Sequence, residues 1–355
     1  KLAFISMRYV VILNLSLVVV LGSCAPETPE WETANPVLPV PEPPLGVDHS
    51  WEEIENPPTP VSVRLGRWLF YDTRLSADNT ISCATCHRPE NAFSEPTAVS
   101  TGIGGQKGGR KAPTFINAAW ALLPHTFWDG RASSLEEQAL GPIANPIEMG
   151  NTHEQLLVTI GNIDGYGKYF EEVFGSSEVT KERIGKAIAD YERTRMSGNS
   201  PYDRWKNGDE AAVSEDVKLG DQLFFDKAGC NQCHLGYNFT DSLFHNLGIG
   251  WNDKAEVFSD NGRFEITGIE HETGAFKTPT VREVTKRSPY MHDGSILTLR
   301  EVVTFYNRGG NANPNLDPKM QPLSLTDEEI DALVAMMEAM SGEGYADVGP
   351  SLFPQ

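Results

Sequence analysis

The sequence predicts a mainly α-helical protein that contains two homologous halves in tandem. Apolar residues recur at helical spacing in several segments, for example in residues 181–195, 214–226 and 326–340. No run of the sequence shows the alternation of apolar and polar residues that marks a half-buried strand. A pattern in residues 61–200 returns in residues 201–345, which indicates an internal duplication.

The composition is that of a globular protein large enough for two domains. The chain has 355 residues, of which 39% are hydrophobic and 22% are charged, and these values exclude a wholly disordered or fibrous protein. Acidic residues exceed basic ones, and the formal net charge is −20. This charge repels nucleic acids and anionic membrane surfaces, so the sequence predicts no nucleic-acid partner and favours a basic protein partner.

The N-terminal segment has the pattern of an export signal. Lys1 and Arg8 precede an apolar run over residues 9–21, which is too short for a membrane-spanning helix. A Leu-Gly-Ser-Cys sequence typical of a bacterial lipoprotein cleavage site follows, with Cys24 as the lipidated residue. The sequence therefore predicts a signal peptide over residues 1–23 and a periplasmic protein that meets the membrane only through a lipid anchor. A plain signal peptide followed by an unmodified cysteine is the alternative.

Residues 24–60 are expected to form an extended, semi-stiff linker, because prolines are frequent there. These prolines are Pro26, Pro29, Pro36, Pro39, Pro41, Pro43, Pro44, Pro57, Pro58 and Pro60. The two predicted domains follow over residues 61–200 and 201–345, and residues 346–355 are expected to be a short tail.

Each half begins with a similar helical segment that leads into a Cys-x-x-Cys-His motif, the attachment signature of c-type haem. Two thiols at this spacing reach the two vinyl groups on one porphyrin edge, and the histidine then lies below the iron as its proximal ligand. The residues predicted to hold two haem c groups are Cys83, Cys86 and His87 in the first half and Cys230, Cys233 and His234 in the second. A zinc site made of all four thiolates and a pair of redox disulfides are the alternatives. The expected fold is thus two cytochrome c-like haem domains in tandem.

The two halves differ at a position where a difference in chemistry would follow. Each half has a Leu-x-Glu sequence, and the residue seven positions after its leucine is Pro142 in the first half and Tyr306 in the second. A phenolate can bind ferric iron, whereas proline offers no side-chain donor. If both positions face their haems, His234 and Tyr306 close the second iron, while His87 alone leaves the first iron open to peroxide. An ordinary half-buried tyrosine is the alternative.

Two further residues of the first half are candidates for redox and proton chemistry. Trp128 stands before an Asp-Gly pair where the second half has His292, and an oxidisable indole can relay electrons; a large core residue is the alternative. Glu148 lies in a turn-rich loop after Pro142, where a carboxylate beside an open haem could carry a proton between two peroxide oxygens. A surface glutamate without a catalytic part is the alternative.

Together these motifs resemble the bacterial di-haem cytochrome c peroxidase and MauG family over about residues 60–342. The resemblance rests on the paired haem motifs and on Phe-Trp-Asp-Gly-Arg, Leu-Glu-Glu-Gln, Asn-Pro-Ile-Glu-Met and Pro-Tyr-Met-His-Asp-Gly sequences. It implies an enzyme whose first haem is the peroxide site and whose second haem relays electrons. It also implies that Trp128 is the relay between the haems, that Gln138 hydrogen-bonds on the distal side, and that Glu148 is the acid–base residue.

Tyr306, in its Phe-Tyr-x-Arg-Gly setting, indicates the MauG-like branch of this family. Typical peroxidases of the family have methionine at this position, and a phenolate in its place lowers the potential of the second haem. The resemblance therefore implies oxidation of that haem beyond ferric, as in the bis-ferryl state of MauG-like proteins. Typical peroxidases also block the first haem with a distal histidine from the loop that here spans residues 101–110, which contains no histidine. The first haem is therefore expected to be open without reductive activation.

The resemblance further implies one calcium ion between the haems, held partly by the main-chain carbonyls of Arg287 and Pro289. The asparagine ligand expected with them is replaced by Lys111. A cation cannot ligate calcium, so the sequence implies the site and also removes one of its ligands.

Three functions remain open from the sequence. The first is a peroxidase that reduces hydrogen peroxide with electrons from a small cytochrome c or a cupredoxin. The second is a MauG-like enzyme that oxidises side chains of a specific protein partner, and the third is a non-enzymatic electron carrier. Relatives occur as monomers and dimers, so a homodimer is one expectation for this chain. The remaining histidines are expected to be surface or structural residues: His49, His125, His153, His245 and His271.

Overall fold

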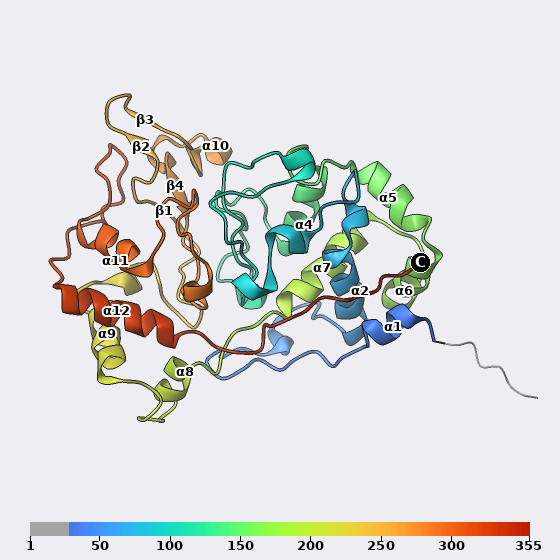
Figure 1. The fold of residues 1–355 in the computed structure, drawn as a ribbon, viewed down its shortest axis with the longest axis horizontal. Helices are drawn as coiled ribbons and strands as arrows, with labels where there is room; N and C mark the ends of the chain where they lie inside the picture. The colour runs from blue at the N-terminus through green and yellow to red at the C-terminus, as the bar shows by residue number, and fades with distance from the viewer. Residues whose placement is uncertain (1–27) are drawn as a thin grey trace, which may run out of the picture.

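The computed structural model describes residues 28–355, so the predicted signal peptide and Cys24 lie outside the described residues. This part of the chain is mainly α-helical, as the sequence predicts, with long loops and 3-10 turns between the helices (Figure 1). The α-helices are α1 (Glu30–Ala34), α2 (Pro60–Tyr71), α3 (Cys83–Cys86), α4 (Leu135–Ala144), α5 (His153–Gly161), α6 (Asp164–Phe174), α7 (Lys181–Arg193), α8 (Pro201–Lys206), α9 (Glu215–Phe225), α10 (Phe264–Thr267), α11 (Leu299–Asn307) and α12 (Asp327–Ala339). None of the helices in residues 28–355 is long and apolar enough to cross a bilayer.

The helices gather into two units that repeat one arrangement. In the first unit α2 crosses α7 at Gly66, where an added Cβ would lie 1.8 Å from the carbonyl oxygen of Ala187. In the second unit α9 crosses α12 at Gly220, where an added Cβ would lie 2.1 Å from the carbonyl oxygen of Ala332. A side chain cannot be accommodated at either distance, so the Leu-Gly pair repeated in the sequence marks the helix crossing of each unit. A third helix completes each packing group, α4 against α7 and α11 against α12.

Each unit has its own apolar core. The first core surrounds α2 and α7 and includes the fully buried Trp68, Phe70 and Phe170. The second core surrounds α9 and α12 and includes Phe224 and Met336. Burial of a large apolar side chain contributes about 1.5–3 kcal/mol, so each core supplies a large share of the stability of its own unit.

The second unit also contains short strands that the sequence pattern did not indicate. These are β1 (Phe244–Asn246), β2 (Trp251–Asn252), β3 (Val257–Phe258) and β4 (Ala275–Lys277). Strand β1 pairs antiparallel with β4, and β2 pairs antiparallel with β3, in an insertion that lies beside α11 in Figure 1. With two or three residues each, the strands are too short to show an alternating pattern in the sequence.

Both terminal segments pack against the two units. In the proline-rich stretch, the carbonyl oxygen of Gly46 accepts a 2.8 Å hydrogen bond from the buried Arg282 of the second unit. After α12 the chain crosses back to the first unit, as the red trace of Figure 1 shows. There Asp347 pairs with Arg67 at 2.6 Å, and the carbonyl oxygen of Leu352 accepts from the indole of Trp68 at 3.1 Å. The stretch expected as a linker and the segment expected as a tail therefore join the units to each other.

Candidate active site

The first Cys-x-x-Cys-His motif forms α3 and the turn that follows it. Cys83 and Cys86 are the ends of this helix, and both line a cavity of about 590 Å³. His87 lines the same cavity, and its Nδ1 lies 3.0 Å from the carbonyl oxygen of Phe93. Because a carbonyl oxygen only accepts hydrogen bonds, Nδ1 must carry the proton, and Nε2 is left free to bind a metal.

The second motif repeats this geometry in a second cavity of about 240 Å³. Cys230, Cys233 and His234 line it, and Nδ1 of His234 lies 2.9 Å from the carbonyl oxygen of Phe239. The accepting phenylalanine stands six residues after the histidine in the first unit and five residues after it in the second. Each unit therefore fixes its histidine by a main-chain hydrogen bond within its own loop, with Nε2 left free.

These two sets of residues fit covalently attached haem. Burial lowers the pKa of His87 and of His234, which favours the neutral ring that binds metal. One cysteine pair lines each cavity, so the four thiols do not converge on a common zinc site. All four are free thiols, so these cysteines form no disulfides either. Thiols and a free imidazole nitrogen on the wall of one cavity are the groups that attachment of haem c requires.

The two cavities differ at the duplicated position that the sequence singled out. Pro142 of α4 lines the first cavity, and Tyr306 of α11 lines the second. Tyr306 is enclosed in the second cavity, and desolvation raises the pKa of its phenol. The phenol therefore stays neutral until a bound cation stabilises its anion. Met320, a thioether that sequence reasoning did not consider, also lines this second cavity.

The wall of the first cavity includes the loop that was expected to lack a distal histidine. Gly102 and Gly108–Arg110 of this loop, with Ser100 just before it, line the cavity without supplying an imidazole. A different histidine does line it: His125, from the segment just before Trp128. His125 is half-buried, and its Nδ1 has no hydrogen-bond partner among the described residues. Sequence reasoning did not place His125 at this cavity, because the residue lies outside both haem motifs and outside the sequences on which the duplication rests.

Carboxylates and side-chain amides line the first cavity, among them Glu148, Glu192 and Gln138. Glu148 accepts a 2.8 Å hydrogen bond from the side chain of Asn145, and Gln138 lies on the same wall. Burial raises the pKa of Glu148, while the charge of Arg131 and the Asn145 hydrogen bond oppose this rise. Glu192 of α7 was missed by sequence reasoning because it reads as part of an amphipathic helix. It is fully buried, and burial raises its pKa to about 8.

Trp128 lies at the junction and lines both cavities. Its indole N–H donates to the carbonyl oxygen of Lys111 at 2.8 Å, and its own carbonyl oxygen accepts from the main-chain N–H of Lys277 at 2.8 Å. The duplicated partner of Trp128 is His292, whose carbonyl oxygen accepts from the N–H of Lys111 at 2.8 Å. The rings of Trp128 and His292 meet edge to face with centroids 6.4 Å apart. Each unit thus pairs its lysine with the aromatic residue of the other unit.

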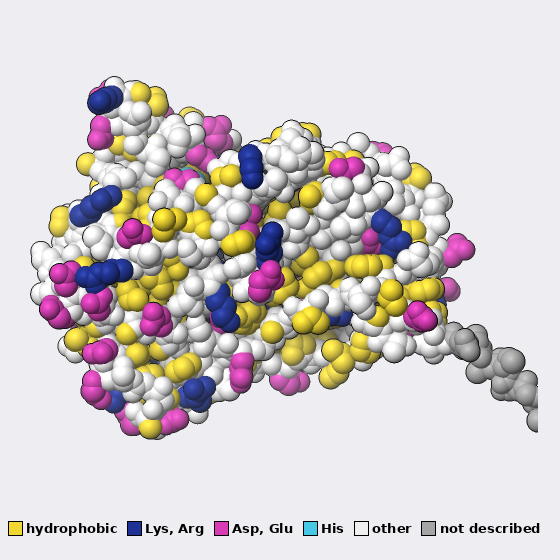
Figure 2. Space-filling model, viewed as in Figure 1, with side chains coloured by type: hydrophobic (Ala, Val, Ile, Leu, Met, Phe, Trp, Pro, Cys, Tyr) yellow, Lys and Arg dark blue, Asp and Glu magenta, His cyan; other side chains and the backbone are white. Residues whose placement is uncertain are grey.

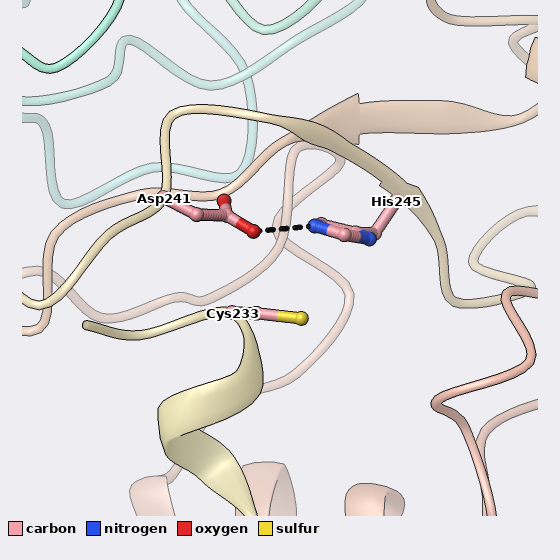
Figure 3. A group of neighbouring side chains, drawn as sticks. All are labelled: Cys233, Asp241 and His245. Atoms are coloured by element: carbon pink, nitrogen blue, oxygen red, sulfur yellow. Dashed lines mark hydrogen bonds and ion pairs between the residues drawn. The ribbon is translucent and has the colours of Figure 1, made fainter.

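His245 lines the second cavity and belongs to a cluster of charged side chains, two of which are drawn in Figure 3. Its ring lies 2.9 Å from Asp241 and 2.6 Å from Asp317, and these carboxylates help raise the pKa of His245 to about 10 against the effect of burial. The cluster also contains Cys233, and together Cys233, Asp241 and His245 have the spacing of a metal site. However, Cys233 belongs to the haem motif, so we assign His245 a structural role.

Three other histidines lie away from both cavities. His49 stacks on Trp120 with ring centroids 5.6 Å apart, and Nε2 of His153 lies 3.1 Å from the carbonyl oxygen of Leu140. His271 is exposed on a 3-10 turn. None of these three lines either of the two cavities.

The residues at the expected calcium position do not fit a calcium ion. Lys111 is buried there, and its ammonium group donates to the carbonyl oxygens of Glu95 and Thr97. Arg287 is also buried, and its positive charge acts to lower the pKa of Lys111. Calcium prefers six to eight oxygen ligands, with carboxylates among them, and two nearby cations oppose its binding. No step of the chemistry below is assigned to calcium.

Comparison with known proteins agrees with this geometry. A family model described as di-haem cytochrome c peroxidase matches residues 60–211. The chain is 39% identical to the methylamine utilization protein MauG of Methylorubrum extorquens over 298 residues, which cover 84% of this chain and 83% of that protein. The chain belongs to the di-haem cytochrome c peroxidase and MauG family.

Members of both branches are found among its relatives. The chain is 37% identical to the cytochrome c551 peroxidase of Nitrosomonas europaea, with coverage of 79% of each protein. It also superimposes on the crystal structure of a MauG-like protein associated with microbial copper homeostasis, with a TM-score of 0.76 and 30% identity over 88% of this chain and 96% of the other. The protein is therefore an oxidoreductase with two haem c groups and the tandem fold of this family.

Proposed function

We propose that this protein is a periplasmic peroxidase that reduces hydrogen peroxide in the cavity of His87. The observation that carries the proposal is the difference between the two cavities. Pro142 offers no ligand atom in the first, whereas Tyr306 offers a phenol in the second. With haem bound, the iron at His87 would keep a free position for peroxide, while His234 and Tyr306 would hold the other iron, which would exchange electrons only.

The side chains of the first cavity are suited to moving protons. When bound, haem supplies the iron that exchanges electrons with peroxide. Asn145 holds one oxygen of Glu148 at 2.8 Å, so the carboxylate can take a proton from one peroxide oxygen and return it to the other. Gln138 lines the same cavity and can donate an amide N–H to a bound oxygen. The positive charge of Arg131 favours the ionised form of Glu148, which the first proton transfer requires.

Electrons would reach the first cavity through Trp128, whose ring borders both cavities. The donor is proposed to be a small cytochrome c or cupredoxin with a basic docking face. Exposed acidic side chains gather over α9 and α12 of the second unit, on the left side of Figure 2. They include Glu215, Asp216, Asp327, Glu328 and Asp331. A basic donor would be attracted to this surface, which covers the unit that holds the second cavity.

A second candidate function is supported by Tyr306. A phenolate ligand favours the oxidised state of iron, so the second haem would be a weak electron acceptor from an ordinary donor. In that case the protein, once oxidised by peroxide, would oxidise side chains of a specific protein partner. The resemblance to MauG proteins supports this alternative. A non-enzymatic electron carrier requires a sixth ligand in both cavities, and in the first cavity a residue such as His125 would have to supply it.

Electron paramagnetic resonance of the resting ferric protein tests the proposal. We expect a high-spin signal from the first haem and a low-spin signal from the second, and loss of the high-spin signal after one equivalent of peroxide. Only low-spin signals would contradict an open first haem, and the His125→Ala variant would then show whether His125 closes it. Steady turnover of peroxide with reduced cytochrome c supports the peroxidase. Oxidation by peroxide without turnover with any small donor would instead favour a protein substrate.

A further inference from the structure

The junction between the cavities contains a buried cation that belongs to the chain itself. Lys111 is 4% exposed, and its ammonium group donates to the carbonyl oxygens of Glu95 and Thr97. Burial lowers the pKa of Lys111 to about 8, while the charge of Glu95 opposes this effect. The amine is therefore positively charged at neutral pH, inside a region that borders both cavities.

The main-chain groups of Lys111 are also hydrogen-bonded. Its N–H donates to His292 at 2.8 Å, and its carbonyl oxygen accepts from the indole of Trp128 at 2.8 Å. Side chain and main chain thus connect three segments: the loop at Glu95, the aromatic residue of the first unit and the corresponding residue of the second. Lys111 therefore links segments of the chain in the way that a metal ion bound to their carbonyl oxygens would.

A buried carboxylate of the same chain, that of Glu95, compensates the positive charge of Lys111. The carboxylate of Glu95 is 4% exposed and accepts from the main-chain N–H of Ala112 and from the hydroxyl of Ser100, both at 2.6 Å. A neighbouring hydrogen bond is repeated in the second unit: Thr240 donates to the carbonyl oxygen of Thr278 at 2.7 Å, as Ser94 does to that of Ala112. The segments next to Glu95 and Lys111 are therefore duplicated in the second unit, and both charges at the junction are supplied by side chains of the chain itself.

We propose that Lys111 is the fixed cation of the junction in place of calcium, and that it positions Trp128 through its main chain. The positioning part rests on the proposed role of Trp128 as a relay, whereas the replacement of calcium does not. The positive charge stabilises the reduced form of both haems, because reduction adds a negative charge near the ammonium group. Since this cation is covalently part of the chain, chelators cannot remove it.

Metal analysis of the haem-loaded wild-type protein tests the replacement of calcium. After dialysis against EGTA and then against excess calcium, we expect no stoichiometric calcium and unchanged visible and electron paramagnetic resonance spectra. One firmly bound calcium per chain, or spectra that change with EGTA, would overturn the proposal. This measurement needs no variant and no activity, so it can fail while the proposed peroxidase function stands.

Three variants test the role of the charge. Lys111→Met should lower the reduction potentials of both haems, Lys111→Arg should leave them near the wild-type values, and Lys254→Met, at an exposed lysine in the β2–β3 turn, should have no effect. Lys111→Asn restores an oxygen donor and should bind calcium that the wild type does not bind. Unchanged potentials in Lys111→Met would refute the electrostatic role. If Lys111→Met does not fold, the comparison of Lys111→Arg with Lys111→Asn decides, because only the arginine keeps the charge without calcium.

Discussion

Replacement of Glu148 by glutamine removes one proton acceptor from the first cavity and changes little else. Glutamine has the same shape, and its carbonyl oxygen can still accept the 2.8 Å hydrogen bond from Asn145. The stability and the haem spectra of the variant should therefore resemble those of the wild type. A positioned general acid–base group typically contributes 10²- to 10⁴-fold in rate. We expect the rate of peroxide cleavage to decrease by a factor within this range, which corresponds to about 2.7–5.4 kcal/mol of lost transition-state stabilisation.

The assay is stopped-flow mixing of the ferric protein with peroxide, followed at the Soret band over a range of pH. Because burial raises the pKa of Glu148, the wild-type rate should fall as the pH drops through this raised value, and the Glu148→Gln variant should lose that dependence. Glu154→Gln is the matched control, since Glu154 is exposed on α5 and does not line the cavity. An unchanged rate in Glu148→Gln, with the same pH profile as the wild type, would refute the assignment.

Four further substitutions separate the roles of other residues. Trp128→Phe keeps a ring but loses the hydrogen bond of the indole, and one equivalent of peroxide should then oxidise only one iron in magnetic resonance spectra; oxidation of both irons would exclude the relay. Tyr306→Phe removes the phenol, so the second haem should become high-spin, and a spectrum that stays low-spin would point to another ligand. Asp203→Ala leaves Arg282 buried without its partner and should cost about 3–5 kcal/mol in urea unfolding, against less than 1 kcal/mol if the pair were unimportant. Burial raises the pKa of Glu192 to about 8, so the contribution of Glu192 to the free energy of unfolding should be highest at low pH and should fall as the pH rises towards about 8. The Glu192→Gln variant cannot ionise at this position, so its free energy of unfolding should depend less on pH. The same pH dependence in variant and wild type would contradict this.

The sequence predicted the fold class, the duplication and the two haem motifs because these features depend on local requirements. A Cys-x-x-Cys-His motif has the spacing that one porphyrin demands, and the similar helical segment before each motif is visible as a repeat. That α2 crosses α7 at Gly66 became known only from the structure. The difference between Pro142 and Tyr306 at equivalent positions was also visible in the sequence, since it requires only the alignment of one half with the other. That Tyr306 is an iron ligand remains a prediction, although its side chain lines the expected cavity.

Contacts between residues far apart in the chain were decided only by tertiary structure. No periodicity brings His292 to Lys111, places Trp128 between two cavities, or directs Glu192 and His125 to the wall of the first one. The sequence could show that Lys111 is a poor calcium ligand, but only packing of both units could bury its ammonium group among carbonyl oxygens. Spacing along the chain predicts motifs whose residues act together locally, such as the haem attachment sites. The burial of a side chain, which changes its pKa, depends on how the whole chain folds.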